Sequence, residues 1–217
     1  MTEEIKATAR RHLAEGGAAN LSLRAVARDL GMVSSAIYRY VPSRDDLLTA
    51  LIIDAYTSLG EAAESAEASV PREDLLGRFC ALGRAVRDWA IAHPHEYALT
   101  YGSPVPGYVA PPDTLEPGSR VSLALLGILV DGFAAGAVSR PLDQLAPPVL
   151  ANMTAVAGRA APGLPPELMA RGMIVWSQLF GAVTFDVFGR IDAIVDDKAT
   201  WFDHQLLAMA RSVGLAP

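Results

Sequence analysis

Residues 22–48 read SLRAVARDLGMVSSAIYRYVPSRDDLL, and this stretch decides the fold. Ala27 is small where two helix axes have to cross closely, and Gly31 stands where a sharp turn needs a backbone with positive φ. Two short helices that meet at such a turn form a helix-turn-helix, which we place at about residues 22–41.

The second short helix of this motif is expected to bury one of its faces. Val33, Ile37 and Val41 lie four residues apart and predict its buried stripe. Ser34 or Ser35 is expected to cap its N-terminus. The opposite face is then left to solvent or to a partner.

The outward face of this helix has a composition that suits DNA. Successive side chains on an α-helix turn by about 100°, so Ser35 and Arg39 lie about 160° from Ile37, with Tyr38 beside them. Small residues allow close approach, tyrosine reaches a phosphate or a thymine methyl group, and arginine pairs with guanine. The face therefore predicts binding in the major groove of double-stranded DNA.

Three further side chains are placed for the DNA backbone. Tyr40 points sideways from the same helix, and Arg24 and Arg44 fall in the first turns of the neighbouring helices. Phosphate contacts of this kind fix the position of a protein on the duplex. The alternative is a small three-helix bundle whose outer face is merely solvated.

Two more helices flank the motif. Ile5, Ala9 and Leu13 recur every four residues and predict an N-terminal helix. Ser43 and Asp46 form a capping-box pattern that opens a long helix. Its inward side chains are expected to be Leu47, Leu48, Leu51, Ile52, Ala55 and Leu59.

The rest of the chain also has helical patterns, and no stretch alternates convincingly as a strand, so the predicted class is all-α. Helices are expected at roughly 72–92, 95–101, 119–138, 143–159, 166–189 and 197–213. The five prolines and three glycines of residues 102–118 predict an irregular loop. We divide the chain into a three-helix head, residues 1–56, and a helical bundle, residues 57–217.

Composition limits the classes of protein to consider. Of the 217 residues 51% are hydrophobic, which is enough for a folded core. The single cysteine, Cys80, excludes an intramolecular disulfide and cysteine-based zinc fingers, and we expect it to be a small buried side chain. No secretory signal is visible. The run 121–139 carries Asp131 and three glycines, and its unbroken apolar stretch is shorter than a bilayer needs, so we expect a cytoplasmic protein without a membrane partner.

The charge is distributed unevenly along the chain. The net charge of −6 conceals seven basic and four acidic side chains in residues 1–44, a net of +3. Residues 45–217 hold 11 basic and 20 acidic side chains, a net of −9. A basic head on an acidic body favours nucleic-acid binding by the head.

The bundle contains several weaker candidates for a site. Asp131 stands alone in an apolar helix, where it is either paired or facing a ligand cavity. Two histidines around a proline, His93 and His95, are poor chelators, so we expect a helix cap and turn there, with no metal and no cofactor. Four aromatic side chains either line a pocket or pack in the core: Trp89, Tyr97, Tyr101 and Trp176.

The last two helical segments have wide apolar faces, which either pack on their own bundle or pair with a second chain. The side chains concerned are Leu179, Phe180, Val183, Val187, Phe202, Leu206 and Met209. No nucleotide-binding, hydrolase or metalloprotease motif is found, so we expect no enzyme. A helical small-molecule-binding protein or enzyme with a protein-interaction head remains the alternative.

Residues 1–56 resemble the DNA-binding domain of TetR-type transcriptional regulators. The resemblance rests on Ser22, Val26-Ala27, Gly31-Met32, Ile37-Tyr38, Tyr40-Val41 and Ser43-Arg44-Asp45-Asp46-Leu47-Leu48. In the bundle, Trp176 to Gly181 is similar to the Trp…His-Gly signature of one TetR C-terminal class, with Phe180 in place of the histidine.

This resemblance implies a homodimeric repressor that binds operator DNA and is released by a small-molecule effector in the C-terminal bundle. It also implies that the last two helices pair across a two-fold axis. The family's DNA-contact positions fall on Arg24, Ser34, Ser35, Tyr38, Arg39, Tyr40 and Arg44.

Overall fold

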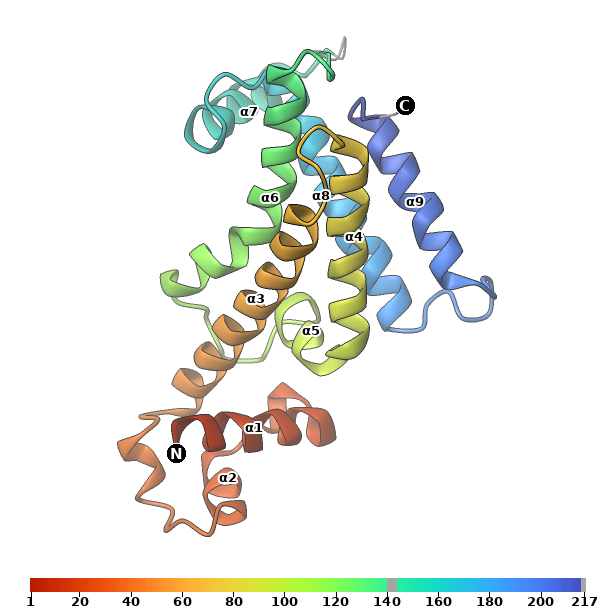
Figure 1. Cartoon of the computed structure of the whole chain (residues 1–217). Helices are drawn as coiled ribbons and strands as arrows, with labels where there is room; N and C mark the ends of the chain where they lie inside the picture. Colours follow the sequence, from red (N-terminus) through yellow and green to blue (C-terminus); the bar gives the residue numbers. More distant parts are fainter. Residues whose placement is uncertain (140–143, 216–217) are drawn as a thin grey trace. The chain divides into compact units, whose positions relative to one another are not determined.

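The regular structure is helical throughout the residues that the computed structural model describes, 1–139 and 144–215, and these contain no strand (Figure 1). With η for 3-10 helices, the elements are α1 (Thr2–Gly16), η1 (Ala18–Asn20), α2 (Leu23–Asp29), η2 (Ile37–Arg39), α3 (Arg44–Ala68), α4 (Leu75–Ala92), α5 (Pro94–Tyr101), η3 (Pro112–Thr114), α6 (Leu115–Ala134), α7 (Pro147–Ala160), α8 (Pro166–Val187) and α9 (Lys198–Ser212). The all-α class predicted from the sequence is confirmed.

The chain divides into two compact units. The head unit consists of Met1–Leu59 together with Ala90–Gly118, and the bundle unit of Gly60–Trp89 together with Ser119–Pro217. The sequence suggested a single boundary near residue 56. The structure differs because the segment with α5 and the proline-rich stretch packs with the head.

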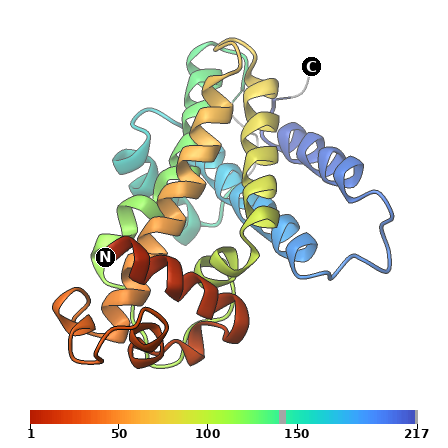
Figure 2. The same cartoon turned by 60° about the horizontal axis from the view of Figure 1, so that its bottom comes forward.

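α1 closes the core of the head unit. Its predicted stripe is confirmed, since Ile5 and Ala9 are fully buried and Leu13 nearly so. Figure 2 shows α1 beside α2, and Nε2 of His12 lies 2.7 Å from a carboxylate oxygen of Asp29 on the loop side of α2. This hydrogen bond lowers the pKa of Asp29 and joins the two helices.

A Schellman motif ends α2 and creates the sharp turn. The Met32 amide donates to the Ala27 carbonyl at 2.8 Å, and the Gly31 amide donates to the Arg28 carbonyl at 3.0 Å. Gly31 has a φ of 66°, as the sequence predicts for this position. The chain is therefore redirected within two residues.

The second short helix of the motif differs from the prediction. Ser34 and Ser35 lie in turns rather than at a helix cap, and only Ile37–Arg39 is helical, as η2. Val33 is 75% exposed, so its expected place in the buried stripe is wrong. The amides of Ala36, Arg39 and Tyr40 donate to carbonyls three residues earlier, which is the 3-10 pattern, and no run of α-helical hydrogen bonds forms.

α3 begins where the capping pattern predicts. The Ser43 hydroxyl accepts from the Asp46 amide at 3.1 Å and donates to the Asp46 carboxylate at 2.6 Å. The six inward side chains predicted for this helix are all buried. In α2, in contrast, the side chain of the N-cap residue Ser22 makes no capping hydrogen bond.

α6 begins earlier than expected. It starts at Leu115, so that Pro117 and Gly118 lie in its first turn rather than in a loop. Proline is tolerated there because the first amides of a helix have no intrahelical acceptor. The helix expected at 143–159 is α7, which begins at Pro147; residue 143 lies outside the described residues.

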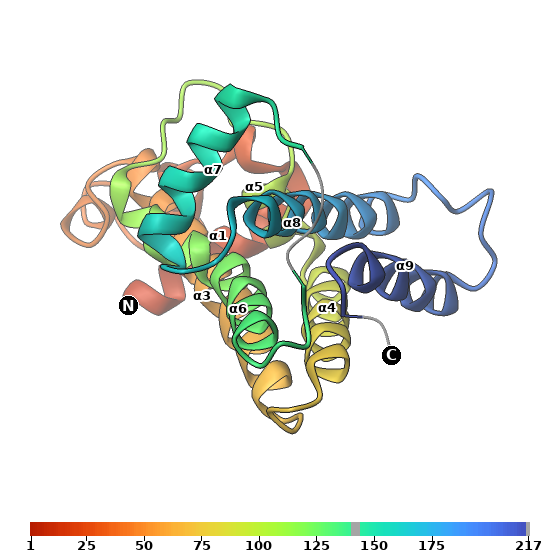
Figure 3. The same cartoon turned by 90° about the horizontal axis from the view of Figure 1, so that it is seen from above.

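Charged side chains connect the helices of the bundle unit. Nε of Arg87 on α4 lies 2.7 Å from the nearly buried carboxylate of Asp186 on α8, and its guanidinium stacks over Phe202 of α9. Figure 3 shows α8 and α9 side by side. The contacts of Arg87 with both helices hold them against α4.

Two segments, Pro112–Ala134 and Pro166–Val187, are long and apolar enough to cross a membrane by length and composition alone. The first overlaps the run noted in the sequence, and the second was not noted there. Core helices of soluble proteins pass the same test, so the finding is weak evidence for a membrane.

Replacement by alanine is expected to change the free energy of unfolding in opposite directions at Gly31 and at Gly127. Gly31→Ala is expected to lower the free energy of unfolding by about 1–2 kcal/mol, because an L-residue is strained at this φ although nothing lies within 4 Å of the new methyl group. Gly127→Ala, inside α6 and equally uncrowded, is expected to raise it by about 0.5–1 kcal/mol. Urea denaturation followed by circular dichroism measures both, and an unchanged stability of Gly31→Ala contradicts the assigned turn.

Candidate nucleic-acid interface

The short segment after the Gly31 turn is anchored by a single large side chain. Ile37 is fully buried in the head core, and Val41 is buried next to it, together with side chains of α1, α2 and α3. Because η2 has only three residues, its orientation depends on this burial rather than on helix propensity. The buried Ile37 thus determines which side chains face outward.

The outward side chains are those predicted for DNA. Tyr38 is 45% exposed and Tyr40 is 46% exposed, which is high for large aromatic side chains. Ser34, Ser35 and Arg39 are exposed as well. The structure brings these five residues together on one short segment, with Arg24 exposed on α2.

The cations of the head differ in whether they are paired. Nζ of Lys6 lies 2.8 Å from Asp54, and Arg10 reaches both Asp54 at 2.6 Å and Glu96 at 3.1 Å. Within the part of the chain that the structure describes, neither Arg24 nor Arg39 has an ion-pair partner. These two guanidinium groups therefore remain available to phosphate or base acceptors.

Arg44 has a different environment from the one predicted. Its guanidinium donates to the Ala18 carbonyl at 2.9 Å, the Leu21 carbonyl at 3.1 Å and the Ala19 carbonyl at 3.3 Å. These carbonyls end the η1 turn between α1 and α2. Most of its donors are thus used within the head, and sequence reasoning missed this role because the partners lie 23 to 26 residues away.

The proline-rich stretch braces the head, which the sequence also missed. Tyr108 packs against the head core, and its hydroxyl lies 2.9 Å from the Thr49 hydroxyl of α3. The ion pair of Arg10 with Glu96 attaches α5 to α1 in the same unit. The only signal in the sequence is an aromatic residue in a loop that is rich in proline and glycine.

The residues proposed for a ligand pocket are dispersed. Trp176 lines a pocket of the bundle unit, whereas Tyr97 and Tyr101 stack on each other in the head unit, 5.2 Å between ring centroids. Trp89 is buried in α4. Asp131 pairs with Arg78 at 2.8 Å and with Arg72 at 2.7 Å, so of its two expected environments the paired one is observed.

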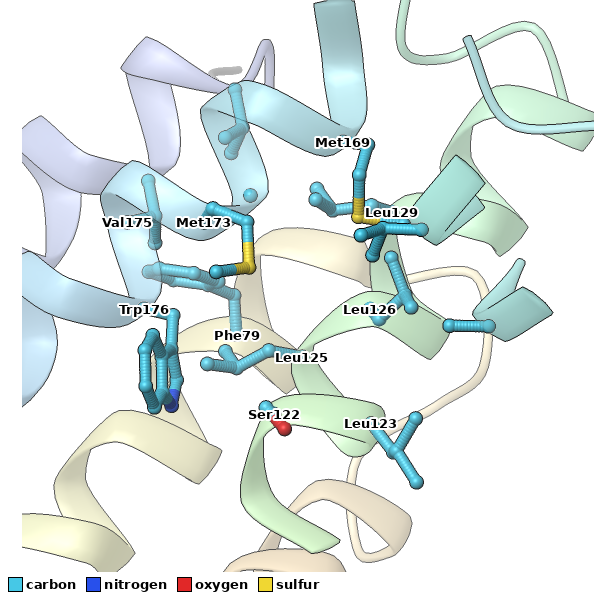
Figure 4. A pocket seen from close by; sticks show the side chains of 14 residues that line it. Phe79, Ser122, Leu123, Leu125, Leu126, Leu129, Met169, Met173, Val175 and Trp176 are labelled. Atoms are coloured by element: carbon cyan, nitrogen blue, oxygen red, sulfur yellow. The ribbon is translucent and has the colours of Figure 1, made fainter. Parts of the chain in front are cut away.

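The pocket that contains Trp176 lies among α4, α6, α7 and α8 of the bundle unit (Figure 4). Its remaining lining was not predicted, because such side chains fit an ordinary apolar core equally well. They are Phe79, Ser122, Leu123, Leu125, Leu126, Leu129, Val156, Ala160, Met169, Gly172, Met173, Val175 and Val213.

The predicted dimer residues mostly belong to the chain's own core. Leu179, Phe180, Val183, Phe202, Leu206 and Met209 are all buried within the single chain, and Val187 is half-buried. Of the two readings of the apolar stripe, packing on the chain's own bundle is the one observed. Contact of these side chains with a second chain remains a prediction, and Met209 also lines the hollow between α8 and α9.

Another face of α8 and α9 is left exposed. Ile174 and Phe185 of α8 are more than half exposed, and Trp201 of α9 is 40% exposed. Phe185 and Trp201 line a shallow hollow between the two helices, along with Gln178 and Gln205. We call this the α8–α9 outer face.

Comparison with known proteins agrees with this architecture. Residues 5–51 match the family model "Bacterial regulatory proteins, tetR family", and residues 79–209 match the model "Tetracyclin repressor-like, C-terminal domain". The two matches fall on the helix-turn-helix and on the helices that form the pocket and the α8–α9 outer face.

Curated relatives and solved structures point the same way. The HTH-type transcriptional regulators Rv1816 of Mycobacterium tuberculosis (strain ATCC 25618 / H37Rv) and Mb1846 of Mycobacterium bovis are each 42% identical over 201 residues, 90% of this chain and 85% of the relative. The crystal structure of the protein SCO4313 superposes with a TM-score of 0.76 at 33% identity, covering 96% of this chain and 94% of that one. A tetR-family regulatory protein from Rhodococcus RHA1, at 16% identity and a TM-score of 0.67 over 100% of this chain and 98% of that one, shares the fold.

These observations define a bacterial transcriptional regulator with a DNA-binding helix-turn-helix. The chain belongs to the tetR family.

The carbonyl contacts of Arg44 predict a loss of stability rather than only a loss of DNA affinity. Arg44→Ala removes one donor from each of three carbonyls, of which that of Ala18 keeps the Leu21 amide, and is expected to lower the free energy of unfolding by about 1–3 kcal/mol. Arg44→Lys is expected to restore only part of it, since an ammonium group cannot reproduce the planar fork. Thermal unfolding measures both variants; wild-type stability of Arg44→Ala would show that these contacts contribute nothing.

Proposed function

We propose that the chain is a repressor that binds double-stranded operator DNA as a homodimer and is released by a small-molecule effector. DNA binding is supported above all by the two faces of one short segment. Ile37 is fully buried in the head core, whereas Tyr38, Arg39 and Tyr40 face solvent. Exposed aromatic and unpaired cationic groups on one face suit a polyanion with flat bases. As an operator-binding protein without catalytic chemistry, it would act in the cytoplasm.

The proposed contacts divide into two kinds. Ser34, Ser35, Tyr38 and Arg39 enter the major groove, where arginine pairs with guanine. Arg24 and Tyr40 contact the phosphate backbone, which positions the head without reading sequence. In a dimer, two heads would bind half-sites about 34–36 Å apart, one helical turn of the duplex.

Arg24 and Arg39, which have no ion-pair partner among the described residues and are proposed to contact DNA, give the test of the DNA-binding face. On a duplex from the region upstream of the protein's own gene, Arg24→Ala is expected to weaken binding on all sequences and to reduce the slope of log K against log salt by about one. Arg39→Ala is expected to cost about 1–3 kcal/mol and to relax base preference.

Arg159→Ala is the matched control, because Arg159 is an exposed arginine of the bundle unit with no proposed DNA contact. Gel shifts at two salt concentrations give the readout. If Arg24→Ala and Arg39→Ala both bind like Arg159→Ala, the face is misassigned. If the wild-type chain shifts no duplex at either salt concentration, a head that contacts protein is favoured instead.

The proposed dimer contact is the α8–α9 outer face. Ile174, Gln178 and Phe185 recur at helical spacing on one side of α8, and Trp201 and Gln205 do so on α9. Apolar side chains that stay exposed in this pattern need a cover, and the same patch on a second copy supplies one by two-fold symmetry. The buried residues of α8 and α9 that were predicted from the sequence lie in the core beneath this face.

Phe185→Glu tests the dimer, because it places a charge in the middle of the α8–α9 outer face. The variant is expected to elute as a monomer in size-exclusion chromatography with light scattering and to bind DNA at least about tenfold more weakly, since one head grips instead of two. Val149→Glu, which changes an exposed apolar side chain of α7, is expected to remain dimeric. A Phe185→Glu variant with the mass of a dimer would exclude this face as the contact.

A further inference from the structure

The pocket of the bundle unit is small and lined almost entirely by carbon and sulfur. Figure 4 shows Met173 and Trp176 projecting from α8 toward Leu125 and Ser122 of α6. The cavity has a volume of about 130 Å³, close to the roughly 150 Å³ apolar cavity that takes up benzene or xenon. Its size therefore suits a ligand of about one aromatic ring.

Among the residues that the structure describes, none that lines the pocket is charged. Its one hydroxyl, on Ser122, already donates to the Ser119 carbonyl at 2.7 Å. A carboxylate or ammonium group brought into such a site loses its hydration without gaining an opposite charge, which is costly. We propose that this pocket selects uncharged, apolar molecules of single-ring size and rejects ions of the same shape.

Two charged groups beside the lining are engaged elsewhere, while Arg159, next to the lining residue Ala160, is exposed to solvent. Asp131, two residues beyond the lining residue Leu129, is held by Arg72 and Arg78. Arg171, next to the lining residue Gly172, donates to the Ser212 carbonyl at 2.9 Å. Neither Asp131 nor Arg171 is free to neutralise a ligand charge.

Two half-exposed side chains mark the mouth of the pocket. Leu123 of α6 is 49% exposed and Met173 of α8 is 42% exposed, and both also line the cavity. Val156 lines it from α7, a helix with only one buried residue, Ala157. Methionine side chains are flexible and polarizable, so Met173 and Met169 can adapt to planar ligands of different outline.

The inference extends the proposed function, because it gives the chemical class of the effector that the bundle would take. Three probes of one ring size separate charge from shape: toluene, benzoate and benzylammonium at pH 7. Methionine methyl groups labelled with ¹³C report the site, since Met169 and Met173 line the pocket while Met32 lies in the head unit.

Toluene is expected to shift the Met169 and Met173 methyl resonances and to raise the melting temperature, while the Met32 methyl resonance is unchanged. Benzoate and benzylammonium are expected to bind at least about tenfold more weakly. The proposal is overturned if either ion binds at these methionines as tightly as toluene, or if toluene leaves both resonances unchanged.

Space-filling variants test that the probes enter this cavity. Val156→Phe and Leu123→Phe, from two different helices, are each expected to weaken toluene binding at least about tenfold. Both side chains are partly exposed, so the fold should accept the change. Val149→Phe makes the same substitution on α7 outside the lining and is expected to bind toluene like the wild type. Undiminished binding in both filled variants contradicts the assigned cavity.

The DNA assay separates this inference from the proposed function. If toluene binds at Met169 and Met173 but does not release DNA, the proposed ligand class stands. The proposal that a bound ligand releases the DNA is then contradicted. Benzoate or benzylammonium that binds as tightly as toluene overturns the ligand class, whatever happens to the DNA.

Discussion

The burial of Ile37 is the constraint on which the DNA-binding surface depends. A three-residue 3-10 helix between a glycine turn and a proline has no stability of its own, so its orientation comes from the one side chain that it places in the head core. With Ile37 inside and the Gly31 turn setting the direction of the chain, Tyr38, Arg39 and Tyr40 can only face outward. Arg44 and Tyr108 then hold the surrounding segments against the same core.

The two units follow different chemistry. In the head, most cations are tied to carboxylates or carbonyls, and the ones left without partners, Arg24 and Arg39, lie on the exposed segment and on α2. In the bundle, ion pairs such as that of Arg87 with Asp186 join the helices, and the side chains that line the cavity are apolar. One unit thus exposes cations on its surface, and the other encloses an apolar pocket.

Whether a feature could be predicted from the sequence depends on how far apart along the chain the interacting residues lie. The stripe of Ile5, Ala9 and Leu13, the Gly31 turn and the Ser43 cap are local, and each is confirmed. Val33 was misplaced because an α-helical period was applied to a segment that tertiary packing makes a 3-10 helix. The apolar stripe from Leu179 to Met209 shows another limit of sequence reasoning. When a helix has two apolar faces, its sequence does not indicate which of them packs against the rest of its own chain. Arg44 and the pocket lining depend on contacts between distant segments, which periodicity does not contain.

The most direct measurement of the central claim is the protection of one engineered thiol by DNA. The Ser35→Cys variant places a reactive group on the exposed segment, and Ser69→Cys places one on an exposed position after α3. The native Cys80 is buried, which raises the pKa of its thiol and keeps it slow to react. The account predicts that duplex DNA slows alkylation at position 35 manyfold and leaves position 69 unchanged. Equal alkylation rates at position 35 with and without bound duplex would contradict it.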